Sequence, residues 1–279
     1  EISSIAAIIN GTTNFMLSLM LSENVSYKDA LKQAQELGYA EPNPTNDVEG
    51  IDATYKLAIL CGLAFHVDVD PAEIYTKGIS NIELQDLKYA DELGYSIKLL
   101  AKADLIDNQL ICLVCPTLIQ KSEPLSKVDG VLNAIQLKGD LVEQVILEGP
   151  GAGSSATSSA ILGDVISTAK NIHLSWIESN NAILNKIQIN NTGDFKSRFY
   201  IRINVIDEPG VLATIAGIMS KYSISIASVI QAASDPKKNT AQIVLITHDA
   251  SQKNIDVALD TISKEKKVDK IFNVLPIVD

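Results

Sequence analysis

The chain has 279 residues, 46% of them hydrophobic and 20% charged, a composition typical of a soluble globular protein with one large or two modest domains. It carries 23 Lys and Arg against 34 Asp and Glu; the net charge of −11, with no basic cluster, argues against nucleic acid and anionic membranes as partners. No apolar run is long enough to span a membrane, no secretory signal is visible, and the 3 cysteines fit a reducing cytoplasm. Because the chain opens at Glu1 and not at Met, we expect a fragment.

Helix and strand signals alternate in the first third of the chain. Ser26 is a good N-cap, and Gly38 and Gly94 each follow a helical pattern as stop signals. The pattern predicts a strand over residues 5–10, helices over 12–21, 27–37, 48–63 and 84–93, and an irregular loop over 40–47. From Lys56 onward the third of these helices is apolar nearly all round, so we expect it to be buried.

Strand signals dominate from residue 97 onward. Four apolar or β-branched runs are separated by turn residues and predict an antiparallel meander with the earlier helices on one face; the runs are 97–103, 110–118, 131–137 and 142–147. A glycine-rich turn then leads into an amphipathic helix, and the polar residues 180–193 are interpreted as a connector.

The last part of the chain forms a separate unit in this interpretation. Its order of elements is βαββαβ, the ferredoxin-like arrangement, with strands over 198–206, 225–232, 241–247 and 268–274 and the second helix over 251–264. The fold class is therefore α+β, divided into a first domain over 1–177, a linker over 178–197 and a second domain over 198–279.

The strongest local signal for chemistry is the segment EPNPTNDVEGIDATYK, residues 41–56. Asp52 and Lys56 stand four apart, so they share one helix face. Burial favours the neutral lysine and a nearby carboxylate favours the cation, so the pKa of such a lysine can be poised for proton transfer. Glu41, Asp47 and Glu49 add negative charge suited to a substrate ammonium. The alternative is an ordinary ion pair beside a solvated acidic loop, and spacing alone favours that alternative.

Three further motifs carry weaker signals. The run Gly149-Pro150-Gly151-Ala152-Gly153 precedes a helix and lets a ligand approach the backbone, although spacing alone favours a tight turn capped by Ser154 or Ser155. Cys112 and Cys115 form a CxxC within a strand, which indicates core thiols and no metal site. The turn Asp207-Glu208-Pro209-Gly210 exposes backbone N–H groups at a helix start, where a carboxylate can bind, but an ordinary strand-to-helix turn is the simpler interpretation.

Taken together, these segments resemble homoserine dehydrogenase, and the tail resembles an ACT domain, a small regulatory fold that binds amino acids. The ACT resemblance rests on DEPGVLATIAGIMSKYSISIASV, residues 207–229. The catalytic resemblance rests on IINGTTNFML (8–17), ALKQAQELGYAEPNPTNDVEGIDATYKLAIL (30–60), ELGYSIKLLAKA (92–103) and GPGAGSSATSSAILGDV (149–165).

The resemblance implies an NAD(P)-dependent oxidoreductase that interconverts L-aspartate 4-semialdehyde and L-homoserine on the route to threonine, isoleucine and methionine. It also implies an N-terminal Rossmann domain, which this sequence lacks, and a monovalent-cation site that would lie in that missing region. We therefore expect the chain alone to be inactive.

The resemblance also implies site residues, position by position. Lys56 would donate a proton to the aldehyde oxygen and Asp52 would orient it. Substrate-binding residues would be Glu41, Asp47, Thr12 and Gly11, and cofactor-binding residues would be Gly153 and Gly151. After these glycines, residues 154–157 read SSAT, where the family more often has a Gly and a Pro, so the loop shape is expected to differ.

For the tail, the resemblance implies feedback regulation by an amino acid, threonine first, bound beside Asp207, Pro209 and Gly210 in a homo-oligomer. Two alternatives stay open. One is a non-enzymatic amino-acid sensor whose first domain is a degenerate scaffold. The other is a dehydrogenase of another amino-acid semialdehyde or hydroxy acid; the acidic loop, which suits a free amine, disfavours simple hydroxy acids.

Overall fold

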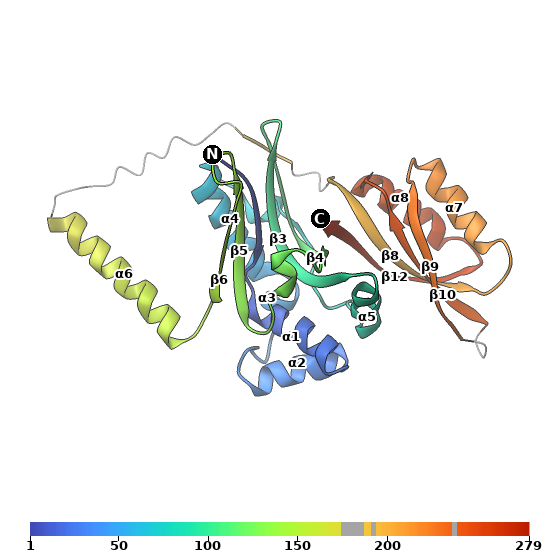
Figure 1. The fold of residues 1–279 in the computed structure, drawn as a ribbon, viewed down its shortest axis with the longest axis horizontal. Helices are drawn as coiled ribbons and strands as arrows, with labels where there is room; N and C mark the ends of the chain where they lie inside the picture. Colours follow the sequence, from blue (N-terminus) through green and yellow to red (C-terminus); the bar gives the residue numbers. More distant parts are fainter. Residues whose placement is uncertain (174–186, 191–193, 236–238, 279) are drawn as a thin grey trace.

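The computed structural model describes residues 1–173, 187–190, 194–235 and 239–278. Its strands join into one sheet that runs through the whole molecule, with helices on one side of its first half and two further helices over its second half (Figure 1). The order across the sheet is β6 (Gln144–Pro150), β5 (Leu132–Gly139), β1 (Ile2–Ile8), β3 (Tyr95–Ile106), β4 (Gln109–Gln120), β12 (Val268–Val278), β8 (Lys196–Ile206), β10 (Thr240–Thr247) and β9 (Ile226–Asp235). The predicted α+β class is confirmed.

The helices of the first half are α1 (Gly11–Ser22), α2 (Tyr27–Glu36), α3 (Thr45–Val48), α4 (Ile51–Phe65) and α5 (Leu84–Glu92). The side chains of Asn10 and Ser26 accept N–H bonds at the starts of α1 and α2, so the predicted cap at Ser26 is confirmed. Along β1, Ile5 and Ala7 face the helices, whereas Ala6 and Ile8 face a smaller cluster on the other side. This alternation gives the sheet one helix-covered face.

The predicted meander is wrong in one respect. The first strand of the chain, β1, lies between β3 and β5 and pairs antiparallel with both. The β3–β4 and β5–β6 pairs are antiparallel neighbours as expected. Their order could not follow from local signals, because β1 enters the sheet from a distant part of the sequence.

The predicted helix over 48–63 is divided. Gly50 has φ +78 and separates α3 from α4, a conformation that glycine adopts most easily. The expectation that α4 is buried all round is also wrong, since Tyr55, Ile59 and Leu63 are 58%, 64% and 71% exposed. A helix that packs on a sheet buries a single stripe, and in α4 this stripe is formed by Ala53, Leu57, Cys61 and Phe65.

The second half has the ferredoxin-like arrangement that the order of elements predicted. Its strand order is β12-β8-β10-β9, with α7 (Val211–Lys221) and α8 (Gln252–Ser263) between strands. Its sheet is joined to that of the first half, because β12 pairs in parallel with β4 through Ile277↔Leu118 and Val278↔Ile119. Short elements that were not predicted are β2 (Tyr75–Thr76), β7 (Gln188–Ile189), β11 (Ala250–Ser251), η1 (Pro71–Glu73) and η2 (Pro124–Lys127).

The glycine-rich turn leads into α6 (Ser154–His173), the predicted helix, and no residue of α6 is buried. Most of the predicted connector over 180–193 lies outside the described residues. Cys112 and Cys115 are buried in different clusters on opposite faces, which agrees with their interpretation as core thiols. Among the described residues, no helix has the length and apolarity needed to cross a membrane.

Candidate active site

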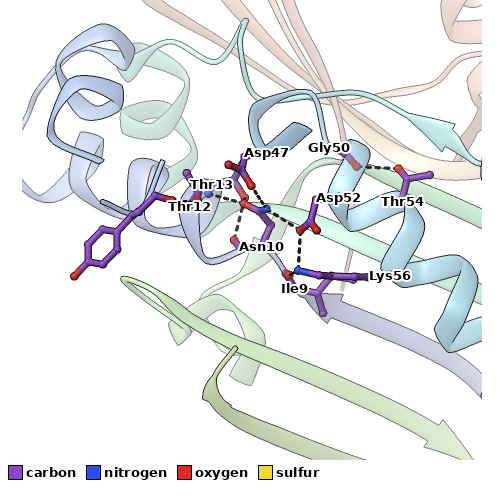
Figure 2. Close-up of polar contacts among 10 residues, drawn as sticks. Ile9, Asn10, Thr12, Thr13, Asp47, Gly50, Asp52, Thr54 and Lys56 are labelled. Atoms are coloured by element: carbon purple, nitrogen blue, oxygen red, sulfur yellow. Dashed lines mark hydrogen bonds and ion pairs between the residues drawn. The ribbon is translucent and has the colours of Figure 1, made fainter. Parts of the chain in front are cut away.

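Lys56 and Asp52 form an ion pair on α4, with 2.8 Å between Nζ and Oδ2 (Figure 2). The Lys56 ammonium also donates to the backbone carbonyl of Ile9, just beyond the end of β1, at 3.1 Å. An ammonium has three N–H donors, and nothing in the described part of the chain accepts the third. The side chains of Lys56 and Asp52 are 47% and 31% exposed, so a ligand can reach this third donor.

Asn10 connects this pair to a second carboxylate. Its Nδ2 donates to Asp47 at 2.7 Å and to Asp52 at 2.9 Å, while its Oδ1 accepts from Thr13 and caps α1 (Figure 2). The residue is 5% exposed and its amide is fully used. Asn10 therefore fixes the positions of two carboxylates that come from different helices.

The turn at Gly50 explains how these carboxylates meet. Asp47 lies on α3 and Asp52 in the first turn of α4, and the left-handed Gly50 between them reverses the chain. Thr54 donates its hydroxyl to the Gly50 carbonyl at 2.9 Å, and the Gly50 N–H donates to the Asp47 carbonyl at 3.0 Å. A Cβ at Gly50 would lie 3.3 Å from Val114, so the turn is also tightly packed.

Of the other residues that the resemblance implies for the substrate, Gly11 and Thr12 lie at the start of α1, next to Asn10. The Thr12 hydroxyl donates to the Tyr39 carbonyl at 2.6 Å and is buried, so its O–H is engaged by the fold. Glu41 is exposed, and its side chain makes no hydrogen bond or ion pair within the described residues. The structure therefore brings Asp47, Asp52 and Lys56 together through Asn10, and leaves Glu41 apart from them.

The two glycines assigned to the cofactor lie in the loop between β6 and α6. Gly153 has φ +109, and a Cβ there would meet nothing within 4 Å. A Cβ at Gly151 would lie 1.8 Å from Nδ2 of Asn133, so this position accepts only glycine while Asn133 keeps its place. The Oδ1 of Asn133 is buried and has no hydrogen-bond partner among the described residues.

Sequence reasoning missed Asn10 and Asn133. An asparagine directly before a helix is a common N-cap, so the capping role of Asn10 had a local signal, but its two carboxylate partners lie 37 and 42 residues away. Asn133 lies in the predicted strand VLNAIQL and carries no local signal of a site.

In the second half, Asp207, Pro209 and Gly210 are exposed in the turn between β8 and α7. Gly210 has φ +90 at the N-cap position, and its carbonyl accepts from the backbone N–H and the hydroxyl of Thr214. Lys267 pairs with the neighbouring Glu208 at 2.9 Å. The turn is thus a helix start with accessible backbone.

Chemically, the first group combines one cation with two anions. Asp47 and Asp52 keep acceptor capacity beyond Asn10 and Lys56, and together with the ammonium they leave one net negative charge suited to a cationic ligand group. An unused N–H beside them can donate to an electronegative atom of the same ligand. The arrangement suits acid–base chemistry on a small molecule that carries an amine.

Comparisons with known proteins identify the families that the two parts of the chain resemble. The family model described as homoserine dehydrogenase matches residues 1–166, and the ACT domain model matches residues 199–266. The homoserine dehydrogenase of Neisseria gonorrhoeae is 38% identical over 284 residues, which cover 99% of this chain and 64% of that protein. That of Bacillus subtilis is 34% identical over 273 residues, covering 97% and 63%.

Solved structures show the same similarity. A homoserine dehydrogenase from Thiobacillus denitrificans superposes with a TM-score of 0.92 at 36% identity, covering all of this chain (100%) and 64% of that one. A hyperthermophilic archaeal homoserine dehydrogenase in complex with NADPH superposes with a TM-score of 0.50 at 30% identity, covering 63% and 49%. The chain thus spans somewhat less than two thirds of the length of the curated relatives described above.

Proposed function

The chain belongs to the homoserine dehydrogenase family, and from that premise we propose that the protein containing it interconverts L-aspartate 4-semialdehyde and L-homoserine with NAD(P)H. The observation that carries the proposal is the Lys56 ammonium, which is held by Asp52 and the Ile9 carbonyl and keeps one N–H unused. A decayed site would have no need to keep this charged arrangement at the end of a buried strand.

Asp47 and Asp52 recognise the substrate amine. Both carboxylates accept from the same buried Asn10 amide, so they are held close together before a ligand binds. Glu41 is assigned to the same ammonium by the family resemblance alone. Gly11 and Thr12 contribute the adjoining wall at the start of α1.

Lys56 manages the proton. In the reducing direction its unused N–H donates to the aldehyde oxygen as charge develops there, and in the oxidising direction the neutral amine accepts the proton of the homoserine hydroxyl. Asp52 acts as a positioning residue, because its carboxylate holds the ammonium at 2.8 Å. The Ile9 carbonyl fixes the direction of the third N–H.

The nicotinamide cofactor supplies or accepts the hydride when bound. Residues of this chain fit such a group on two observations. Gly153 has open space around it in a conformation that favours glycine, and the buried Oδ1 of Asn133, whose Nδ2 lies beside Gly151, lacks a donor among the described residues. Gly151 and Gly153 would let the cofactor approach the backbone at the start of α6.

The test is homoserine-dependent reduction of NAD⁺ and NADP⁺ by the complete protein, with Lys56→Ala beside it. Loss of the proton donor should lower kcat by about 10²–10⁴-fold. Lys121→Ala is the matched control, because Lys121 is equally exposed (47%) and pairs with Asp91 away from the site. A folded wild type that is inactive with both cofactors would contradict the proposal and favour the amino-acid sensor.

For the second half, feedback regulation by threonine is the proposed role, with the ligand beside Asp207, Pro209 and Gly210 and with paired ACT units in a homo-oligomer. The exposed helix start at this turn supports a ligand carboxylate there. Calorimetric titration should show threonine binding to wild type and at least 10-fold weaker binding to Asp207→Ala. Asp260→Ala, on the exposed side of α8, should bind as wild type does. Absence of binding to the wild-type oligomer would contradict this role.

A further inference from the structure

Asn133 lies at the point where three strands end side by side. It pairs with Gly149 on β6, and the next residue of β5, Ala134, pairs with Ile8 on β1. Ala134 belongs to the cluster on the far face of the sheet, so Asn133 points to the helix-covered face. This is the face that carries Lys56, whose ammonium is bonded to the carbonyl of Ile9, the residue after Ile8.

The Asn133 amide lies between two glycine positions, Gly151 in the loop after β6 and Gly11 at the start of α1. A Cβ at Gly151 would lie 1.8 Å from its Nδ2, and a Cβ at Gly11 would lie 3.7 Å from its Oδ1. The Gly11 position is also closed by the carbonyl of Val131, which would be 2.9 Å from such a Cβ. Asn133 therefore contacts both the loop assigned to the cofactor and the helix start assigned to the substrate.

The backbone around Asn133 is held firmly. The Nδ2 of Asn14 donates to the carbonyls of Val128 and Leu132, at 3.0 and 3.1 Å. The ammonium of Lys98 donates to the same Val128 carbonyl at 2.6 Å and to the Oδ1 of Asn14 at 3.2 Å. These bonds fix the segment that leads into β5, so the Asn133 amide is presented by a rigid frame.

Within this frame, the Oδ1 of Asn133 is the exception. Asn10 uses both donors and its oxygen, and the Oδ1 of Asn14 accepts from Lys98. The Oδ1 of Asn133 is buried and accepts nothing from the described residues. A buried acceptor without a donor is costly, so a bound molecule that supplies an N–H here gains affinity.

We propose that Asn133 is a cofactor-binding residue whose Oδ1 accepts a hydrogen bond from the carboxamide N–H₂ of the nicotinamide ring. The proposal rests on the proposed function. A cationic substrate amine is drawn to Asp47 and Asp52, which leaves the neutral Asn133 oxygen for a neutral donor. The amide reaches the Gly151 loop through its Nδ2, with Oδ1 on the side of Gly11. Ala134, the next residue, pairs with Ile8, the neighbour of Ile9, so the ring would lie near the Lys56 ammonium, where hydride and proton transfer meet.

The experiment compares cofactors that differ only in this donor. Calorimetric titration of the complete protein measures the Kd of the oxidised cofactor and of its 3-acetylpyridine analogue, in which a methyl group replaces the N–H₂. Wild type should bind the carboxamide form about 5- to 10-fold more tightly, the value of one buried hydrogen bond. Asn133→Ala should bind the two forms with equal Kd.

Gln136→Ala is the matched control, since this amide lies on the same strand but beside Ser4 and Lys102 on the opposite face, and it should keep the wild-type ratio. If Asn133→Ala does not fold, as judged by circular dichroism, Asn133→Ser takes its place. Equal weakening of both forms by the variant would overturn the proposal and indicate a structural role. The proposal would also be overturned if Asn133→Ala kept the wild-type ratio of the two Kd values, or if the substitution changed only the affinity for homoserine. If wild type binds neither cofactor, the proposed function itself fails.

Discussion

Two acid–base pairs in the molecule differ in nearly every respect except their chemistry. Lys56 and Asp52 are 2.8 Å apart, half-exposed, and have one donor without a partner in the described chain. Arg202 on β8 and Asp86 on α5 are 2.6 Å apart and 1% and 0% exposed. Asp86 also accepts from Tyr200 and Asn273, at 3.2 and 2.7 Å. The first pair is open to solvent; the second joins the first half of the molecule to the ferredoxin-like half.

The two pairs differ in exposure and in how many of their polar atoms are bonded within the fold. A lysine at the same 2.8 Å from its carboxylate, Lys98 with Asp129, lies between the two extremes. Its side chain is 4% exposed, and its three donors are used by Asp129, Val128 and Asn14. Distance to the carboxylate therefore does not distinguish the three pairs, whereas exposure and the number of donors bonded within the fold do. Breaking a pair should lower the free energy of unfolding most for Arg202–Asp86, less for Lys98–Asp129 and least for Lys56–Asp52.

The largest loss of stability is expected for Asp86→Ala. The change leaves the Arg202 guanidinium buried with only Glu83 as an anionic partner, and it also removes an acceptor from Tyr200 and Asn273. Removal of one member of a buried pair costs about 3–5 kcal/mol. Denaturant titration followed by circular dichroism measures this loss directly.

The same arginine provides the control. Glu83 is 49% exposed and bonds Arg202 at 2.7 Å, so Glu83→Ala should cost no more than about 1 kcal/mol. If Asp86→Ala and Glu83→Ala lowered the free energy of unfolding by similar amounts, burial would not distinguish the two partners of Arg202. The contrast between the buried and the exposed pair would then fail.

An intermediate loss is expected for Lys98→Met. Methionine keeps the length of the side chain but leaves the Oδ1 of Asn14 without its donor, for a cost of about 1–3 kcal/mol. Lys121→Met removes an equally well-formed but exposed pair with Asp91 and should change the free energy of unfolding by less than about 0.5 kcal/mol. If Lys98→Met leaves the free energy of unfolding unchanged, the hydrogen-bonded segment around Val128 does not depend on this ammonium.

The pH dependence of stability sharpens the comparison further. Burial lowers the pKa of Lys98 from 10.5, against the opposing effect of Asp129. Between the lowered folded value and 10.5 the unfolded chain binds more protons, so this residue makes the free energy of unfolding rise with pH. The difference between wild type and Lys98→Met should therefore widen through the alkaline range. A difference that narrows there would mean that the folded state favours the ammonium.

The periodicity of the sequence predicted the helices and long strands because each depends on neighbours a few residues apart. The partners of β1 and the parallel pairing of Ile277 with Leu118 could not be predicted, since they join residues far apart in the chain. The same holds within the site. The i,i+4 spacing predicted the Asp52–Lys56 pair, but the Asn10 amide that connects Asp52 to Asp47 is a tertiary contact. Asn133 is found only through the glycines that it touches.

Of the three pairs compared, Lys56–Asp52 should contribute least to stability, although its loss is the one expected to affect activity. Lys56→Met removes a half-exposed ion pair and one bond to the Ile9 carbonyl, and exposed i,i+4 pairs contribute about 0.3–0.5 kcal/mol. The free energy of unfolding should thus fall by no more than about 1 kcal/mol, measured in the same denaturant titration. A loss as large as that of Lys98→Met would mean that Lys56 is a structural residue.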